Sequence, residues 1–210
     1  MIIIAIDGPA AAGKGTLAKR LAATLNLPYL DTGLLYRATA KRVLEAGGDP
    51  EDDKAATAAA KALTEADTAR TDLRDAATSK AASQVASIPA VRAALLAYQR
   101  EYANANGAVL DGRDIGTVIF PHADVKLFVT ASVEARAKRR QAEFNAKGEN
   151  IPLGEVVADV AARDEADRTR TAAPLIPAED AILIDTTTLN ADEAFLRAIE
   201  EIKKKQTILS

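Results

Sequence analysis

The sequence predicts an α/β fold in which a five-stranded parallel sheet is flanked by helices. Short aliphatic runs alternate along the chain with longer segments of helical periodicity, a pattern typical of parallel sheets with right-handed crossovers. The runs are apolar at successive positions, which indicates strands covered on both faces. The length of 210 residues suits one domain with a small mobile insertion.

Five aliphatic runs are the predicted strands. The first, "IIIAI", is followed directly by an acid, Asp7. The five runs are residues 2–6, 27–31, 108–112, 125–130 and 181–186. Because they are short and mostly aliphatic, they are typical of strands in the interior of a sheet.

Helical periodicity fills much of the remaining chain. The predicted helices are residues 14–25, 33–46, 91–104, 133–146 and 192–204. Residues 49–87 have no strand signal and are predicted to be a helical insertion on the substrate side. We expect one domain, residues 1–210. Its core would be residues 1–48, 88–144 and 171–210, its insertion residues 49–87, and its lid residues 145–170.

Composition excludes several classes of function. The formal net charge of −3 argues against nucleic acid as a partner. The chain has no cysteine, so disulfide and thiolate chemistry are excluded, and His122 is the single histidine. No apolar run approaches the length of a membrane span, and the first residues lack the basic region of a signal peptide. A cytoplasmic location without membrane partners is therefore predicted.

A glycine-rich loop, "GPAAAGKGT", lies between the first predicted strand and the first predicted helix. Its members are Gly8, Pro9, Ala10, Ala11, Ala12, Gly13, Lys14, Gly15 and Thr16. In this context glycines let backbone N–H groups face phosphates, and the helix N-terminus adds a favourable potential. Lys14 would reach the outer phosphates of a nucleoside triphosphate. The loop therefore predicts a P-loop NTPase-type sheet that binds ATP.

The loop lacks the hydroxyl that usually follows its lysine. Gly15 stands at that position, and Thr16 comes one residue later. Mg²⁺ would then be held mainly through phosphates and water, so no metal-ligating residue is predicted. Phosphoryl transfer depends on positioning and on charge neutralisation. We therefore expect arginines from other parts of the chain to supply positive charge.

Two groups of arginines flank the polar, glycine-containing residues 145–153. The first comprises Arg136, Arg139 and Arg140. The second comprises Arg163 and Arg170, together with Asp167. Spacings of three, four and seven residues place the members of each group on one helix face. A hinged flap with arginines at both ends would exclude water and surround a phosphate on closing. The alternative is a pair of solvated, salt-bridged helices.

Five segments resemble bacterial cytidylate kinases, which belong to the nucleoside monophosphate kinase group. They are "IAIDGPAAAGKGT", "YLDTGLLYR", "AASQVASIPAVRAALL", "LDGRDIGTVIFP" and "RDEADRTRTAAPLIPAEDA", and they extend over nearly the whole chain. The "DGRDIGTV" and "RDxxDRxR" patterns are specific to that family. The resemblance implies an enzyme of pyrimidine nucleotide metabolism, usually monomeric. It would transfer the γ-phosphate of ATP to CMP or dCMP and give ADP and CDP or dCDP.

The resemblance also implies roles for individual residues. Substrate-binding residues would be Thr32, Tyr36, Arg37, Ser83, Arg92, Arg113, Asp114, Asp167 and Arg170. In this set Arg37, Arg113 and Arg170 hold the acceptor phosphate, and Ser83, Arg92 and Asp114 read the cytosine. Catalytic residues would be Lys14, Arg139, Arg140, Arg163 and Arg170, with Arg139 and Arg140 stabilising the transferring phosphoryl group. Asp7 would have an electrostatic or water-mediated metal role.

Two of the base-reading residues have a chemical rationale of their own. Cytosine donates from its N4 amino group, and a carboxylate such as Asp114 accepts such a hydrogen. Arg92 can donate to the ring acceptors N3 and O2. Uracil carries an acceptor, O4, in place of the amino group, so two acceptors would oppose each other at Asp114. The alternative for Asp114 is a cap of a helix beginning near Ile115.

Other functions remain open at this point. The phosphate loop also suits a kinase for UMP, AMP or shikimate. A non-catalytic nucleotide-binding switch would have a metal-binding hydroxyl after Lys14 and few lid arginines, and the sequence shows the opposite. Many members of the resembled family have a longer insertion that includes a small β-sheet. The shorter helical insertion here leaves open the preference between CMP and dCMP.

Overall fold

The computed structural model describes residues 2–146 and 148–209, and its central layer is a five-stranded, all-parallel sheet. The strands are β1 (Ile3–Asp7), β2 (Tyr29–Asp31), β3 (Ala108–Gly112), β4 (Val125–Thr130) and β5 (Ile182–Asp185), in the order β2-β3-β1-β4-β5. The predicted fold class is confirmed. Met1, Lys147 and Ser210, which belong to the predicted core and lid ranges, lie outside the described residues.

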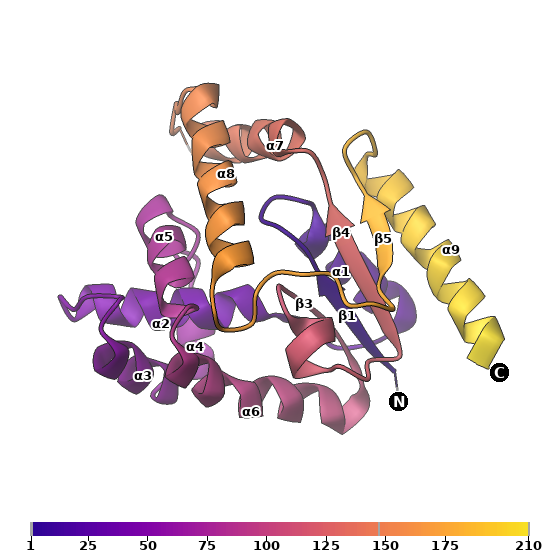
Figure 1. The fold of residues 1–210 in the computed structure, drawn as a ribbon, viewed down its shortest axis with the longest axis horizontal. Coiled ribbons are helices and arrows are strands. Elements are labelled where there is room, and N and C mark those ends of the chain that lie inside the picture. The colour runs from indigo at the N-terminus through magenta and orange to yellow at the C-terminus, as the bar shows by residue number, and fades with distance from the viewer. Residues whose placement is uncertain (1, 147, 210) are drawn as a thin grey trace.

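Helices surround this sheet (Figure 1). They are α1 (Lys14–Leu25), α2 (Thr32–Glu45), α3 (Asp53–Lys61), α4 (Glu65–Thr68), α5 (Ala76–Val85), α6 (Pro89–Asn106), a π-helical turn η1 (Ile115–Ile119), α7 (Val133–Asn145), α8 (Leu153–Thr169) and α9 (Ala191–Leu209). None of the described helices is long and apolar enough to cross a membrane. The segment predicted to be a helical insertion contains α3, α4 and α5.

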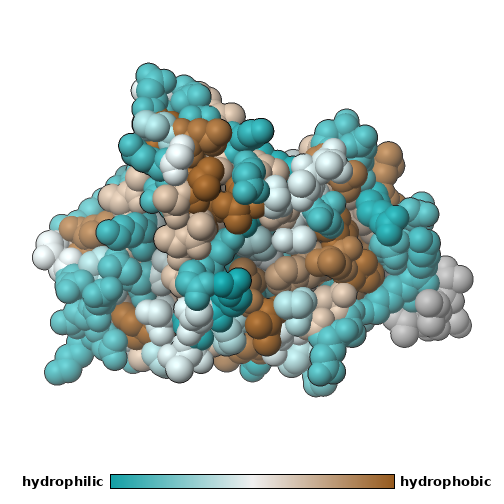
Figure 2. Space-filling view, turned by 45° about the horizontal axis from the view of Figure 1, so that its top comes forward, coloured by the Kyte–Doolittle hydropathy of each residue, from teal (hydrophilic) through white to brown (hydrophobic). Residues whose placement is uncertain are grey.

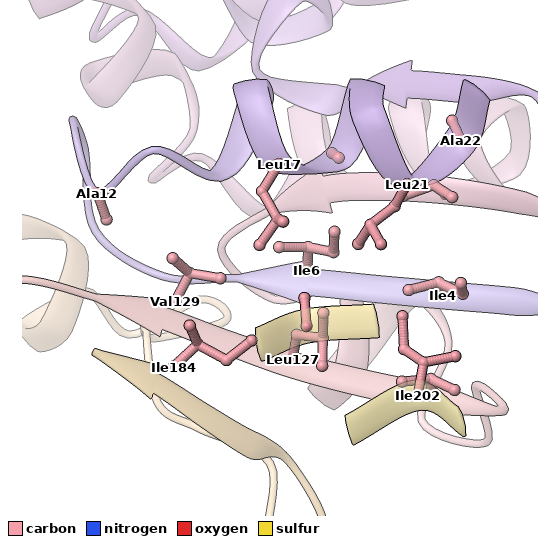
Figure 3. Packing of buried hydrophobic residues seen from close by; sticks show 14 residues of the cluster. Ile4, Ile6, Ala12, Leu17, Leu21, Ala22, Leu127, Val129, Ile184 and Ile202 are labelled. Atoms are coloured by element: carbon pink, nitrogen blue, oxygen red, sulfur yellow. The ribbon is translucent and has the colours of Figure 1, made fainter. Parts of the chain in front are cut away.

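Successive residues of β1 point into different halves of the core. Ile4 and Ile6 pack with Leu17 and Leu21 of α1 and with Ile202 of α9 (Figure 3). The residue between them, Ala5, belongs to a second cluster formed with α6 and η1. Side chains of a strand alternate between the two faces of a sheet. This alternation explains why the run is apolar at every position.

Two further clusters lie outside the sheet. Helices α2, α3, α5 and α6 share one apolar cluster. Helices α7 and α8 form a hairpin whose own cluster contains Phe144, Val156 and Val160. In Figure 1 the strand arrows point toward the top of the view, where α7 and α8 lie, and the group from α2 to α6 lies to the left. The carboxyl ends of the strands therefore face the region between these helical groups.

Local chemistry sets several element boundaries. Asn26 ends α1 in the left-handed conformation with φ 53°, which Asn tolerates well. The amide of Leu27 still donates to the Ala22 carbonyl at 2.9 Å, so β2 begins at Tyr29, two residues later than predicted. The Asp52 side chain accepts from the first amides of α3 and so defines the start of that helix.

Candidate active site

Three carboxylates lie at the ends of neighbouring strands. The register pairs Asp7 of β1 with Gly112 of β3, and Asp31 of β2 with Asp111 of β3. The strand order reverses at β1, which lies between β3 and β4. In open parallel sheets ligands bind beyond the carboxyl ends of the strands at such a reversal. The phosphate loop begins at this point, directly after Asp7.

The phosphate loop has an unusual backbone. Gly8, Ala11 and Gly13 have positive φ angles of 144°, 59° and 89°. A Cβ on Gly8 would lie 1.9 Å from the carbonyl oxygen of Val129, so this position requires glycine. Left-handed residues turn neighbouring N–H groups toward a common concavity, which is the geometry of an anion nest. The loop leads directly into α1, whose N-terminus adds positive potential.

Lys14 is buried beside this loop. Its Nζ donates to the Pro9 carbonyl at 2.8 Å. Burial and, to a smaller extent, the positive charge of Arg113 lower the pKa of Lys14 to about 7, although Asp111 and Asp7 act in the opposite direction. A polyphosphate in the loop would favour the charged lysine and raise this pKa again.

Asp111 lies next to the position where the usual hydroxyl is missing. A Cβ on Gly15 would lie 3.2 Å from Asp111 Oδ2, and the Tyr29 hydroxyl donates to the same oxygen at 3.3 Å. Burial raises the pKa of Asp111 to about 6, and Asp31 also raises it. No group of three acidic, histidine or cysteine side chains that could hold a metal occurs among the described residues. These donors fit a cation held mainly by phosphate oxygens and water.

Several arginines from distant segments crowd together near Lys14. Burial lowers the pKa of Arg37 and of Arg163, and the positive charges of Arg113 and Arg140 lower both further. The opposing charge comes from Asp31, which acts on Arg37, and from Asp167, which accepts from Arg113 Nε at 2.8 Å. So much positive charge with so few carboxylates is typical of a site that receives phosphate groups.

Some guanidinium nitrogens in this cluster are buried without a partner. Arg37 Nε, Arg163 Nε and Arg170 Nη2 have no hydrogen-bond partner among the described residues. Arg170 Nε is used by the Ala173 carbonyl at 2.8 Å. Buried polar atoms are normally paired. The orphaned donors therefore indicate an anionic ligand.

An adjoining pocket lies between α2, α6 and the turn after β3. Its lining residues are Tyr36, Arg92, Ala93, Leu96, Gln99, Asp114, Val118 and Ile119. Arg92 forms an ion pair with Asp114, donates to the Ala86 carbonyl at 3.1 Å, and lies over the ring of Tyr36 at 5.4 Å. The pocket thus combines a carboxylate, a guanidinium and an aromatic ring with apolar walls, which suits a polar heterocycle.

The Asp114 side chain is available to this pocket because another carboxylate caps the turn that carries it. It occupies the position before η1, but its side chain makes no capping hydrogen bond. Asp7 performs that task, because its Oδ1 accepts from the Ile115 amide at 2.8 Å and its Oδ2 from the Gly116 amide at 2.7 Å. The Asp114 carboxylate is thereby left to Arg92 and the pocket.

Four predicted site residues either bond to other parts of the protein or do not line the pocket. Thr32 donates its hydroxyl hydrogen to the Asp111 carbonyl at 2.8 Å, so it joins α2 to β3. Ser83 lies on α5 and is not among the described lining residues of the pocket. Arg139 bonds to Thr186, whose Oγ1 donates to the Ala12 carbonyl at 3.0 Å. Arg140 forms an ion pair with Glu143 at 2.8 Å, and its charge still helps to lower the pKa of Arg163 in the cluster.

Arg136 also lies away from the arginine cluster. It is 3% exposed and forms an ion pair with Asp164 of α8. Its Nη1 donates to the Ala10 carbonyl of the phosphate loop at 3.2 Å, and its Nε to the Ala131 carbonyl at 2.9 Å. The side chain therefore connects α7, α8 and the loop.

Comparisons with known proteins identify one family. The family model described as cytidylate kinase matches residues 4–204. A cytidylate kinase from Acidiphilium cryptum (strain JF-5) is 61% identical over 97% of this chain and 96% of its own length. One from Paramagnetospirillum magneticum (strain ATCC 700264 / AMB-1) is 57% identical over 97% and 99%.

The chain belongs to the cytidylate kinase family. The predicted family and enzyme class are thereby confirmed. A solved structure of an uncharacterized protein from Eubacterium ventriosum ATCC 27560 shares the fold, with a TM-score of 0.57 and 16% identity over 97% of this chain and 99% of that one.

Two residues at this candidate site, Gln99 and Arg74, belong to none of the motifs that the sequence offers. Gln99 lies in the pocket with Arg92 and Asp114. Arg74, from the segment between α4 and α5, donates to Asp31 at 2.6 Å beside the arginine cluster. Arg74 belongs to no pattern with a recognisable spacing. The seven-residue interval from Arg92 to Gln99 is one signal that could have placed Gln99 on the same helix face.

Proposed function

We propose that this member of the cytidylate kinase family transfers the γ-phosphate of ATP to CMP or dCMP and gives ADP and CDP or dCDP. The observation that carries the proposal is the Arg92–Asp114 pair, which lines a pocket next to a cluster of arginines with unpaired donors. Nearby, the phosphate loop offers a second anion site. The site thus offers separate groups of residues for one base, one monophosphate and one triphosphate.

The acceptor base is assigned to the pocket at Tyr36. Asp114 accepts from the cytosine amino group, and Arg92 donates to N3 and O2. A uracil would set its O4 against Asp114, and a buried acceptor facing an acceptor discriminates strongly. UMP is therefore the poorer substrate of the two. A kinase for AMP or shikimate is not favoured. Adenine has an amino group and N1 but no acceptor equivalent to cytosine O2, and its two-ring base is larger, whereas shikimate has neither the amino group nor a ring acceptor.

The acceptor phosphate is assigned to the arginine cluster. Arg37, Arg113 and Arg170 hold it, and Thr32 and Asp167 keep the neighbouring elements in place. Ser83 is still assigned as a base contact. This contact requires α5 to lie closer to the base pocket than it does in this structure. Residues 49–87 serve as the CMP-binding insertion.

The donor phosphates are assigned to residues 8–16. Lys14 stays with the γ-phosphoryl group as it moves to the acceptor. A phosphate oxygen of CMP attacks the γ-phosphorus, the bond from that phosphorus to the β–γ bridging oxygen breaks, and ADP leaves with the electron pair. Mg²⁺, when bound, would neutralise part of the negative charge of the phosphates. Asp111 and Thr16 are the residues that would hold its water shell.

The lid is assigned to residues 145–170. Its closure brings Arg139, Arg140 and Arg163 onto the transferring group and excludes water, which would otherwise compete as the acceptor. Arg163 already lies in the cluster, whereas Arg139 and Arg140 have partners that they would exchange on closing.

A coupled assay that detects ADP tests the proposal. With ATP and Mg²⁺, turnover is expected with CMP and dCMP, weakly with UMP, and almost not at all with AMP. Equal rates with all four monophosphates would contradict the assignment of the base pocket. Comparison of kcat/KM for CMP and dCMP shows whether the short insertion tolerates the missing 2′-hydroxyl.

The proposal includes a monomeric enzyme. All the residues assigned to catalysis come from one chain, so no second copy is needed to complete the site. A cytoplasmic location follows from the proposed substrates, which are nucleotides of that compartment. Light scattering behind a sizing column measures the molar mass, and a dimer with a reduced rate on dilution would contradict a self-sufficient monomer.

A further inference from the structure

One polar side chain in the base pocket has no role in the assignments above. Gln99 lies on α6, two turns after Arg92, and is 1% exposed. It lines the same pocket as Arg92 and Asp114. Burying an amide without satisfying its hydrogen bonds costs free energy, so the partners of its two polar atoms are informative.

The nitrogen of the Gln99 amide is used by the protein itself. Nε2 donates to the Leu95 carbonyl at 3.0 Å. The oxygen, Oε1, is buried and has no partner among the described residues.

The Leu95 carbonyl also determines which way round the amide lies. If the group were turned over, Oε1 would face a carbonyl oxygen, and both atoms would lack a donor. Of the two polar atoms of Gln99, the acceptor Oε1 is therefore the one that remains for a ligand of the pocket that this residue lines.

We propose that Gln99 is a specificity-determining residue whose Oε1 accepts a hydrogen from the exocyclic amino group of the acceptor cytosine. The proposal rests on the function proposed above. A cytosine amino group has two hydrogens, whereas Asp114 already shares one carboxylate oxygen with Arg92. A second acceptor from α6 pairs the remaining hydrogen. Uracil offers no hydrogen at this position, so Gln99 adds to the discrimination against it.

A purely structural glutamine would behave differently on replacement. An unpaired buried acceptor destabilises the free protein, because it has lost its water without gaining a partner. Gln99→Met has a similar length and no unpaired polar atom, so the midpoint of thermal unfolding is expected to stay the same or to rise. Specificity and stability are thus expected to change in opposite directions.

The test is a cycle of two changes, one in the protein and one in the substrate. The enzyme is wild type or Gln99→Met, and the acceptor is CMP or the 5′-monophosphate of the 2-pyrimidinone riboside, which lacks the amino group. In the wild type, loss of the amino group lowers kcat/KM. In Gln99→Met this loss is expected to be smaller by roughly three- to tenfold, which is the coupling between the two groups.

A matched control is Gln84→Met. Gln84 lies on α5 and donates to Glu51 at 3.1 Å in an exposed position. The same chemical replacement there is expected to leave the cost of removing the amino group unchanged. A parallel assay with UMP measures the ratio of kcat/KM for CMP and UMP, which is expected to fall in Gln99→Met alone.

The outcomes separate this proposal from the proposed function. A wild-type enzyme that does not phosphorylate CMP overturns the function itself. An active wild type in which Gln99→Met shows the same cost of amino deletion overturns only the role of Gln99. An equal loss on both acceptors, or a lower unfolding midpoint with unchanged selectivity, also overturns it. If Gln99→Met does not fold, Gln99→Leu is measured in the same cycle.

Discussion

The carboxylate of Asp7 accepts the backbone amide of Gly116 at 2.7 Å, although the two residues are 109 positions apart. The other oxygen accepts from Ile115 at 2.8 Å. Asp7 thus connects the strand that leads into the phosphate loop with the turn that carries Asp114. One side chain therefore positions both the loop proposed to bind the phosphate donor, ATP, and the turn of the pocket proposed to bind the acceptor base.

Asp7→Asn tests this connection. An asparagine keeps one acceptor but sets an NH₂ group against a backbone N–H, so the turn is expected to shift. We expect kcat/KM for CMP to fall by roughly tenfold or more, since a lost hydrogen bond of this kind is typically worth about 1–3 kcal/mol. Steady-state kinetics check this. An unchanged preference of CMP over UMP, together with normal kcat/KM, would show that the turn holds Asp114 without Asp7.

Stability should depend on pH through the same residue. Burial raises the pKa of Asp7 from 3.8 to about 6 against the effect of its two amide bonds. Between these values the folded protein binds more protons than the unfolded chain, so the contribution of Asp7 to stability falls as pH rises from about 4 to 6. Asp7→Asn removes this dependence. Denaturant unfolding at pH 4.5 and pH 7 should show the variant gaining up to about 2 kcal/mol relative to wild type at the higher pH.

The elements of the core could be predicted because their signals are local. The spacing of apolar residues predicted α1 at its observed bounds, and continuous aliphatic runs predicted β3 and β4 at theirs. The boundary of β2 could not be predicted, because it depends on the hydrogen bond from Leu27 to the end of α1.

The site was accessible from the sequence only in part. Motif spacing was enough to propose the phosphate loop and most of the arginines. The partner of each side chain was not, because pairs such as Asp7 with Gly116 or Arg136 with Asp164 join segments far apart in the chain. Gln99 reads as one more residue of an amphipathic helix. Its unpaired oxygen is visible only when Leu95 and Tyr36 are in place around it.

Asp114→Asn is expected to weaken the preference for CMP over UMP. The amide can accept from a cytosine amino group with its oxygen and donate to uracil O4 with its nitrogen. The ion pair with Arg92 is lost as well, so kcat/KM for CMP should fall by roughly 100-fold, while that for UMP falls less or rises. Parallel kinetics with both substrates measure the ratio. A proportional loss on both would mean that Asp114 only holds Arg92 in place.

Binding of ATP should be linked to proton uptake by Lys14. Burial lowers the pKa of this lysine to about 7, so at pH 8 most of the free protein carries it neutral. Phosphate in the loop favours the charged form and raises the pKa, so binding at pH 8 is expected to take up close to one proton, and far less at pH 6. Calorimetric titrations in buffers of different ionisation enthalpy count the protons.

Two substitutions separate Lys14 from other titrating groups. Lys14→Arg stays charged at pH 8, so its proton uptake should disappear even where ATP still binds. Lys14→Ala should abolish turnover, because it removes a charge that follows the phosphates into the transition state. Undiminished uptake in Lys14→Arg would assign the proton to another residue.

Asp164→Asn tests the connection between the lid helices and the phosphate loop. Arg136 is 3% exposed, and its Nη1 lies 2.9 Å from Asp164 Oδ1 and 3.2 Å from the Ala10 carbonyl. Removing the carboxylate leaves a buried guanidinium without its counter-charge, which is expected to cost about 2–4 kcal/mol of unfolding free energy. Because Arg136 bonds to the loop that receives ATP, KM for ATP should rise more than KM for CMP.

The double variant Arg136→Met/Asp164→Leu distinguishes a role in stability from a role in positioning. Apolar replacement of a buried pair often restores stability. We therefore expect unfolding free energy near that of wild type but a KM for ATP that stays high, because no donor reaches Ala10. Glu165→Gln is the matched control, since Glu165 pairs with Arg168 where both side chains are exposed, and its loss should change stability by less than about 1 kcal/mol. If the double variant bound ATP as wild type does, Arg136 would be a packing residue, and the loop would keep its shape without it.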